Sequence, residues 1–428
     1  MLLTVQDYID AKLVHSLHTS ESKSFRGCRR RWNWIFREFW YPRTTAKPLE
    51  FGTAYHVAME KFYSPELWDK PRDVVTELAI QAFRSKCQHQ LDEYCDKNNI
   101  TLRDVDSEIK QDYEERMALG EGMIRYHAEE VSPELDKDLI PRKVEIAFEV
   151  PVTNPDTGEQ LWCVCDTCWA RYTAYMRTIH SDLDSIVGKL FNCSCRSWEE
   201  HLGYWKGLPV TYGGRIDAIF EGVDGRYWVV DWKTAAQLAG DRDEFLLIDD
   251  QVTRYCWALW SIGIRIAGFI YHEQKKGFPE APEPLSRRRL GCLYSVSKSQ
   301  NTNYDLYKKT VEENDNGAYV MGCYDEFLEW LEENGGVFHQ RHTIHRNETE
   351  LKQAARNVYF EALDMTNPDL LIYPNAGRFG CNTCAFRQPC IGVNQGEDYL
   401  YTLRTMFDKR RYHYWEDKQP STDSKGNE

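Results

Sequence analysis

The stretch from Gly214 to Lys233, GRIDAIFEGVDGRYWVVDWK, constrains the fold of this chain more than any other segment. Apolar residues alternate on both sides of a central Asp-Gly dipeptide, a pattern typical of two strands joined by a tight hairpin turn. Because side chains alternate between the faces of a strand, counting from the turn puts Asp217 opposite Asp231 to within one residue of register. Lys233 shares a face of the second strand with Asp231. We therefore expect two carboxylates and one ammonium group to meet on this hairpin.

Two facing carboxylates repel each other unless a cation lies between them. Hard oxygen ligands of this kind suit Mg²⁺ or Mn²⁺. The hairpin therefore predicts a divalent metal site, although the pattern alone does not indicate what the site is for.

The composition is that of a folded, acidic protein. Its 428 residues are enough for two or three structural units. The net charge of −14 does not suggest a nucleic-acid binder, but local patches rather than totals set the field at a binding groove. No apolar run is long enough to span a bilayer and the first residues lack the regions of a signal peptide, so we expect a cytoplasmic protein. Fourteen cysteines in a reducing compartment are poorly explained by disulfides, which makes clustered cysteines candidate metal ligands.

Two helices predicted from their apolar spacing carry further polar side chains. The first covers residues 51–62 and includes His56. The second covers residues 249–260 and places Gln251 and Tyr255 one turn apart on the same face. A lone helical histidine is more often packed or solvated than a ligand, so the spacing alone does not assign His56.

A cysteine-rich insertion separates a strand predicted at residues 143–152 from the hairpin. It contains a C-x-x-C pair followed by a C-x-C pair, and tetrahedral zinc sites take their thiolates from two such short turns. The residues we favour as Zn²⁺ ligands are Cys165, Cys168, Cys193 and Cys195. Cys163, His180 or His201 is an alternative for one of them, and unligated thiols are a further alternative.

The two ends of the chain carry the remaining candidates. Near the start, four arginines are mixed with aromatic residues, a composition suited to phosphate contacts and base stacking; they are Arg26, Arg29, Arg30 and Arg31. A solvated, partly packed helix start explains the same composition. Near the end, three cysteines lie within ten residues, punctuated by Gly and Pro, as in a metal or Fe–S loop that lacks a fourth ligand.

Taken together, these motifs resemble the PD-(D/E)XK nuclease superfamily. Within it they are similar to the RecB-like exonucleases with an iron–sulfur cluster, which include CRISPR-associated adaptation nucleases, AddB and phage-encoded relatives. The family's Gly-x-x-x-His helix resembles Gly52 to His56, and its Gly-x-x-Asp strand resembles Gly214 to Asp217. Its (Asp/Glu)-x-Lys strand resembles Asp231 to Lys233, and its Gln-x-x-x-Tyr helix resembles Gln251 to Tyr255. One departure is Asp231, where many relatives have glutamate.

The resemblance also implies a cluster. The family's ligands are one cysteine upstream of the histidine motif and three near the C-terminus, spaced C-x-x-C-x5-C. In this chain the pattern falls on Cys28, Cys381, Cys384 and Cys390, which implies a [4Fe-4S] cluster that joins the two ends of the chain.

The activity implied by the resemblance is metal-dependent cleavage of DNA. His56, Asp217, Asp231 and the backbone carbonyl of Trp232 would hold Mg²⁺ or Mn²⁺, and Lys233 would orient or help to deprotonate the attacking water. Gln251 and Tyr255 would position the DNA backbone. The resemblance alone implies exonuclease action on single-stranded or free-ended DNA, 5′ to 3′, in recombination, repair or phage DNA processing in a bacterial or phage-infected cytosol. Protein partners are not predicted.

The expected fold is α/β, with a restriction-endonuclease-like mixed sheet flanked by helices, a cysteine-rich insertion and a C-terminal Fe–S loop. The expected segments are an N-terminal arm and histidine helix (1–65), a helical segment (66–140), the first core strand (141–153), the zinc insertion (154–207), the nuclease core (208–300), a second helical segment (301–370), the Fe–S loop with a C-terminal helix (371–415) and a disordered tail (416–428). Two rival functions are a non-catalytic DNA-binding scaffold that keeps the fold and a partner-binding protein built around the zinc insertion.

Overall fold

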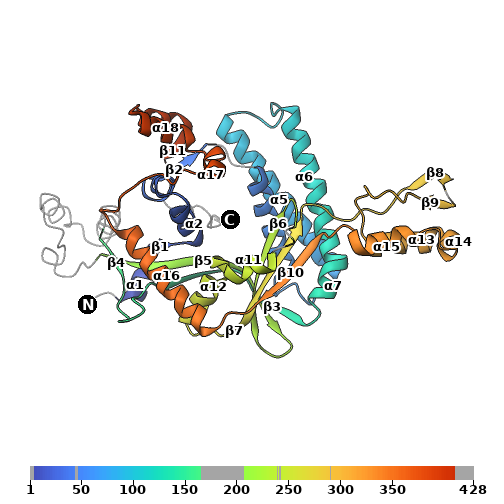
Figure 1. Cartoon of the computed structure of the whole chain (residues 1–428), viewed down its shortest axis with the longest axis horizontal. Coiled ribbons are helices and arrows are strands. Elements are labelled where there is room, and N and C mark those ends of the chain that lie inside the picture. Colours follow the sequence, from blue (N-terminus) through green and yellow to red (C-terminus); the bar gives the residue numbers. More distant parts are fainter. Residues whose placement is uncertain are drawn as a thin grey trace, which may run out of the picture.

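A computed structural model describes residues 4–43, 47–164, 207–238, 240, 242–289 and 291–409 (Figure 1). The four predicted zinc ligands, together with the alternatives His180 and His201, lie outside the described residues, as does the predicted tail. None of the helices in the described part of the chain combines the length and apolar character needed to cross a bilayer.

A mixed sheet forms the centre of the molecule. Its described strands are β1 (His15–Leu17), β3 (Leu139–Pro151), β4 (Trp162–Cys163), β5 (Leu208–Gly222), β6 (Tyr227–Ala235), β7 (Ile266–Lys275) and β10 (His339–Ile344). The order along the main path is β1-β5-β6-β7-β10, and β3 and β4 both pair with β5. β6 and β7 run parallel. β3 and β6 are both antiparallel to β5, and β10 is antiparallel to β7.

The long strand β5 has an interrupted edge. On one edge β3 pairs with it from Thr211 to Gly222, and β4 pairs with Leu208 and Pro209. On the other edge β1 pairs with residues 210–212 and β6 with residues 218–221. The intervening residues, Gly213 to Asp217, therefore have no strand neighbour on that side among the described residues, and the sheet opens there.

Helices cover both faces of the sheet. One face packs against α12 (Asp250–Ser261) and α16 (Glu348–Thr366), whose buried residues join those of β5 and β7 in one apolar cluster. The other face packs against α4 (Lys47–Phe62), α5 (Arg72–Asn98) and α6 (Ser107–Tyr126), which form a second cluster with alternate residues of β5 and β6. The remaining described helices are α1 (Val5–Asp10), α2 (Thr19–Gly27), α3 (Arg29–Trp32), η1 (Asn33–Arg37), η2 (His127–Val131), α7 (Ser132–Leu135), α11 (Arg242–Ile248), α13 (Tyr304–Asn314), α14 (Asn316–Val320), α15 (Asp325–Asn334), α17 (Arg378–Asn382), α18 (Arg387–Gln395) and α19 (Tyr399–Met406).

The fold class predicted from the sequence is confirmed, and so are the hairpin, the strand before the insertion and the helix with Gln251. One prediction was wrong. The segment 301–370 was expected to be helical, but residues 339–344 form the edge strand β10. Its sequence, HQRHTI, contains only one aliphatic residue, and cross-strand pairing with β7 rather than an apolar alternation determines its conformation.

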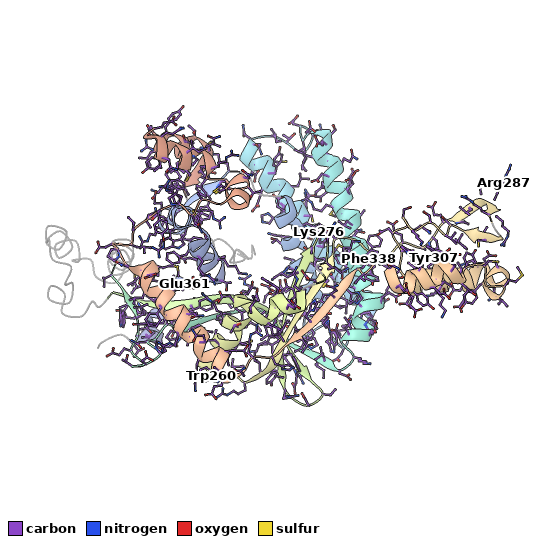
Figure 2. The ribbon with its side chains drawn as sticks, in the orientation of Figure 1. Trp260, Lys276, Arg287, Tyr307, Phe338 and Glu361 are labelled. Atoms are coloured by element: carbon purple, nitrogen blue, oxygen red, sulfur yellow. The ribbon has the colours of Figure 1, made fainter. Side chains whose placement is uncertain are left out.

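An arm of the chain projects from the core between β7 and β10 (Figure 1). It consists of the β8 (Pro284–Arg289) and β9 (Cys292–Tyr294) ribbon packed on α13, α14 and α15, with an apolar cluster of its own. Tyr307 belongs to this cluster, and Arg287 lies at the outer end of the arm, whereas Phe338 lies where the arm returns to the sheet (Figure 2).

A segment of the N-terminal arm meets the end of the described chain beside the sheet. β2 (Trp40–Pro42) pairs antiparallel with β11 (Phe407–Lys409). Around this ribbon Trp34 and Trp40 pack with Phe386, Leu403 and Phe407, and the half-buried Cys384 and Cys390 contact the same cluster. The segment with Cys28 and the segment with the three C-terminal cysteines are therefore neighbours in space.

Glu21 on α2 is a buried carboxyl group that should make stability depend on pH. Burial raises its pKa from 4.5 to about 8, although its Oε1 atom accepts a hydrogen bond from the Trp32 indole at 3.0 Å. The folded pKa exceeds the unfolded one, so the folded state binds more protons between the two values and stability falls as pH rises through this window, by roughly 1.4 kcal/mol per pH unit.

We expect Glu21→Gln to remove this dependence. The amide keeps an oxygen for the Trp32 indole but carries no charge, so the variant should gain melting temperature relative to the wild type at pH 8 and differ little from it at pH 5. Thermal unfolding followed by circular dichroism at both pH values measures this, and an equal effect of the substitution at the two pH values would contradict the assignment.

Candidate active site

The two hairpin aspartates lie where β5 and β6 separate. The observed pairs run from Glu221↔Tyr227 to Ala218↔Val230, so the next pair in this register is Asp217 and Asp231. The prediction that these residues lie opposite each other is confirmed. The pairing of β5 with β6 ends at Ala218 and Val230, so both buried carboxylates lie where the two strands stop pairing.

Asp217 belongs to a compact group of potential metal ligands. Its carboxylate, the imidazole of His56 on α4 and the carboxylate of Glu145 on β3 each offer an atom within 4.8 Å of the others. His56 Nδ1 lies 3.4 Å from Asp217 Oδ2, and the same oxygen accepts a hydrogen bond of 2.8 Å from the backbone N–H of Trp232. Among the described residues, no other set of three such groups is this close.

Glu145 was missed by the sequence reasoning, although it falls inside the predicted first strand. Its neighbours Val144 and Ile146 pair with Ala218 and Ile216, so Glu145 lies across from Asp217. Its φ angle of 48° is in the left-handed region, which non-glycine residues seldom adopt and which is often found at functional sites. The only sequence signal was a glutamate on a strand adjacent to the Gly-x-x-Asp strand, and its significance depends on a register that only the structure supplies.

Asp231 and Lys233 form the second part of the site. Lys233 Nζ lies 2.6 Å from Asp231 Oδ2, and Gln251 Nε2 donates to Asp231 Oδ1 at 3.5 Å. Asp231, which was predicted as a ligand, thus contacts Lys233 and Gln251. The compact group of potential ligands contains Glu145, which was not predicted, and does not contain Asp231. The Asp217 carboxylate lies close enough to raise the pKa of Asp231, so the two parts of the site are adjacent.

The ionisation of the site follows from burial and from these contacts. Burial raises the pKa of Asp231 and of Glu145, and the Asp217 charge raises both further. Burial opposes protonation of His56, but the nearby Asp217 carboxylate outweighs it and the pKa of His56 is raised. For Lys233, burial is outweighed by Asp231 and Asp217, so its pKa is raised and the side chain is an ammonium at neutral pH. The site thus brings three carboxylates, one imidazole and one ammonium group close enough to shift one another's pKa values. A group with this excess of negative charge suits a bound cation.

Tyr255 and Gly214 shape the open edge of β5. A Cβ atom at Gly214 would approach Phe148 Cζ to 2.6 Å and Tyr255 Cε1 to 3.2 Å, so glycine is what allows the tyrosine ring to lie against the strand. The Tyr255 hydroxyl also engages the backbone N–H of Arg215. Tyr255 therefore supports the strand that carries Asp217.

The predicted arginines have partners within the protein. Arg26 lies 2.6 Å from Asp250 and 3.3 Å from Glu361, and Arg29 lies over the rings of Phe25 and Tyr373. Arg30 donates to Asn394 at 2.9 Å and lies 3.4 Å from Cys390 Sγ, while Arg31 influences the pKa of Cys384. All four lie on or beside the segment that contains Cys28, next to the C-terminal cysteine loop.

The cysteine loop lies beside Cys28. Burial raises the pKa of the Cys384 thiol, and the neighbouring thiols Cys28 and Cys381 raise it further. The backbone N–H of Asn375 donates to Cys28 Sγ at 3.4 Å.

Comparison with known families agrees with this geometry. The model of the PD-(D/E)XK nuclease superfamily matches residues 17–391. The chain belongs to this superfamily. A search of curated proteins gave no match. Membership of the PD-(D/E)XK superfamily implies nuclease activity that depends on a divalent metal ion.

The residues present fit such an ion. Glu145 and Asp217 supply hard oxygen donors and His56 an imidazole nitrogen, and the burial of charged carboxylates close together is stabilised when a cation binds between them. The chemistry of this donor set therefore agrees with the metal dependence of the superfamily.

We expect Glu145→Gln to weaken Mn²⁺ binding at least tenfold, because the amide oxygen carries no charge. Isothermal titration with Mn²⁺ measures the affinity directly. Glu221→Gln is a matched control, since Glu221 is a half-buried carboxylate on β5 that pairs with Arg142 and does not belong to the compact group. Equal affinities of the Glu145 variant and the wild type would remove Glu145 from the ligand set.

Proposed function

We propose that this PD-(D/E)XK nuclease is a deoxyribonuclease that degrades single-stranded or free-ended DNA as an exonuclease, in recombination, repair or phage DNA processing in the cytoplasm. The observation that carries the proposal is the group formed by His56, Glu145 and Asp217 beside the Asp231–Lys233 pair, at the point where β5 and β6 diverge. The preference for single strands and ends is supported by the resemblance of the sequence motifs to RecB-like exonucleases.

Each group has a role in phosphodiester hydrolysis. His56, Glu145 and Asp217 would hold Mg²⁺ or Mn²⁺, with Asp231 and the Trp232 carbonyl as the further ligands suggested by the motif. The bound ion supplies Lewis acidity toward a phosphate oxygen and lowers the pKa of a water molecule. Lys233, an ammonium beside this group, orients the water and stabilises negative charge that develops on the phosphate.

Gln251 and Tyr255 have different roles in this proposal. Gln251 reaches Asp231 through its amide and faces the open side of the site, so it is suited to orient the DNA backbone. Tyr255 is nearly buried and acts on the β5 strand. Arg29 to Arg31, which lie at the cysteine loop, are proposed to contact DNA beyond the cleaved bond.

We also propose a [4Fe-4S] cluster on Cys28, Cys381, Cys384 and Cys390. Its support is that Cys28 and Cys381 lie close enough to the Cys384 thiol to raise its pKa and that Cys390 shares the packing cluster of Cys384. The cluster would connect α2 to the C-terminal loop and so stabilise the segment that lies against α12. Metal analysis of the purified protein tests both this cluster and the predicted zinc site, since iron and zinc are counted separately.

The activity test compares open and end-blocked DNA. The purified protein is incubated with Mn²⁺ and labelled single-stranded, double-stranded and circular DNA. An exonuclease degrades the linear single strand and leaves the circular strand and the end-blocked strand intact. Cleavage of circular DNA would replace the exonuclease proposal by an endonuclease, and absence of cleavage under all metal conditions would contradict nuclease function.

A further inference from the structure

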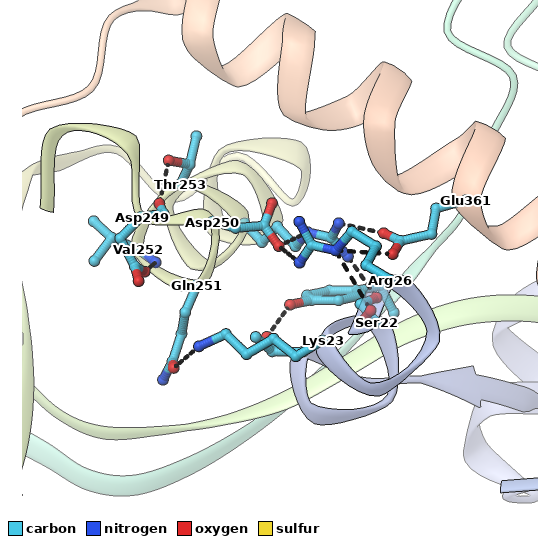
Figure 3. Close-up of polar contacts among 12 residues, drawn as sticks. Ser22, Lys23, Arg26, Asp249, Asp250, Gln251, Val252, Thr253 and Glu361 are labelled. Carbon is cyan, nitrogen blue, oxygen red and sulfur yellow. Dashed lines mark hydrogen bonds and ion pairs between the residues drawn. The ribbon is translucent and has the colours of Figure 1, made fainter. Parts of the chain in front are cut away.

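A buried ion-pair network fixes helix α2 against the helix that carries Gln251. Arg254 on α12 is 2% exposed, and its guanidinium contacts Asp250 at 2.8 Å, Ser22 Oγ at 2.6 Å and the carboxylate of Glu361 (Figure 3). Arg26, on α2, binds the same two carboxylates from the other side. Removal of a partner from a buried network of this kind is costly, so the position of α2 relative to α12 is well defined.

This placement brings Lys23 to the edge of the metal site. Its Nζ atom donates to Gln251 Oε1 at 3.4 Å (Figure 3), and the other end of the same amide donates to Asp231. One amide group therefore separates the Lys23 ammonium from the Asp231 carboxylate. Because the lysine can only donate, it takes the amide oxygen and leaves the amide N–H group for the Asp231 carboxylate, so it helps to fix the orientation of Gln251.

The two basic residues on this side of α2 differ in their charge balance. Arg26 is neutralised by Asp250 and Glu361. For Lys23 no carboxylate among the described residues lies within ion-pair distance, and the side chain is exposed. An exposed ammonium beside a group of metal-binding carboxylates is suited to a phosphate oxygen of a bound strand, which would neutralise it.

We propose that Lys23 is a substrate-positioning residue that binds a phosphate next to the cleaved one and holds Gln251 in its productive orientation. The inference rests on the proposed nuclease function and adds a residue of the N-terminal arm to the active site. It implies that α2 belongs to the DNA-binding surface through Lys23, whereas Arg26 anchors the helix.

The test separates binding from cleavage. Affinity for a labelled single-stranded oligonucleotide is measured by fluorescence anisotropy in EDTA at several salt concentrations, and cleavage is measured with Mn²⁺. For Lys23→Ala we expect affinity to fall roughly tenfold, the slope of log affinity against log salt to decrease by about 0.7, and KM to rise more than kcat falls. Lys23→Arg should restore most of the affinity.

Two controls define the outcomes. Lys137→Ala removes an exposed lysine in the turn between α7 and β3 and should leave the affinity and the salt slope unchanged. Arg26→Ala should lower the melting temperature, whereas Lys23→Ala should not.

A Lys23→Ala protein with wild-type affinity, salt slope and KM would overturn the proposal while leaving nuclease function intact. A loss of melting temperature equal to that of Arg26→Ala would show a structural role instead. Absence of cleavage by the wild type would contradict the nuclease function, whereas the salt slope in EDTA would still test the phosphate contact.

Discussion

Replacing Lys233 by alanine is expected to abolish DNA cleavage, with a loss of roughly 100- to 10,000-fold in kcat. The ammonium lies 2.6 Å from Asp231, and its raised pKa keeps it charged throughout the neutral pH range. Removing it leaves the proposed metal ligands His56, Glu145 and Asp217 in place, so Mn²⁺ binding should persist while turnover is lost. Single-turnover cleavage together with isothermal titration of Mn²⁺ measures the two effects separately.

The complementary change is Asp217→Asn. The amide oxygen still accepts from the backbone N–H of Trp232, so the strand geometry should be retained, but the charged ligand is gone. We expect this variant to lose both Mn²⁺ binding and cleavage. For Lys233, a second variant, Lys233→Gln, keeps a hydrogen-bond donor for Asp231. It shows whether lost activity of the alanine variant is caused by misfolding. Wild-type cleavage by either the Lys233 or the Asp217 variant would refute the assignment of the centre.

The second large effect is expected for Cys28→Ser. If the cysteine joins a cluster with the C-terminal loop, its coordination free energy is part of the folding free energy, so the substitution should lower the melting temperature by at least about 5 °C and remove the visible absorption of an Fe–S protein. Protein purified without oxygen is compared with the wild type by thermal unfolding, iron content and absorption spectrum.

Cys323→Ser provides the matched control. Cys323 is also half-buried, but it lies in the projecting arm outside the cysteine loop. Its substitution should leave iron content and colour unchanged. A colourless wild-type protein that contains zinc in place of iron would contradict the cluster, and an unchanged melting temperature of Cys28→Ser would contradict its stabilising role.

The core of the site was predictable because it depends on local rules. The Asp-Gly turn fixes the register of a two-stranded hairpin, and register alone is enough to place Asp217 opposite Asp231. Helical spacing likewise placed Gln251 and Tyr255 on one face of α12, where both contact the site. These inferences needed only contacts between residues that are close in sequence.

The parts that were missed depend on contacts between distant segments. Glu145 is a ligand candidate only because β3 pairs with β5 in a register that puts it across from Asp217. The polar strand β10 is stabilised by its pairing with β7, which local propensity does not reveal. The arginines of α2 and α3 suggested a DNA contact, but their composition could not show that Arg26 binds Asp250 and Glu361 from α12 and α16.

The sequence by itself determined the hairpin, its facing carboxylates and the neighbouring lysine, since strand alternation and a tight turn leave little freedom in how they are arranged. Only the tertiary structure decided which carboxylates gather around His56, and that Lys23 rather than Arg26 is free to meet a phosphate. The physical reason is that ion pairing and ligand grouping depend on distances of a few ångströms between segments that lie far apart along the chain.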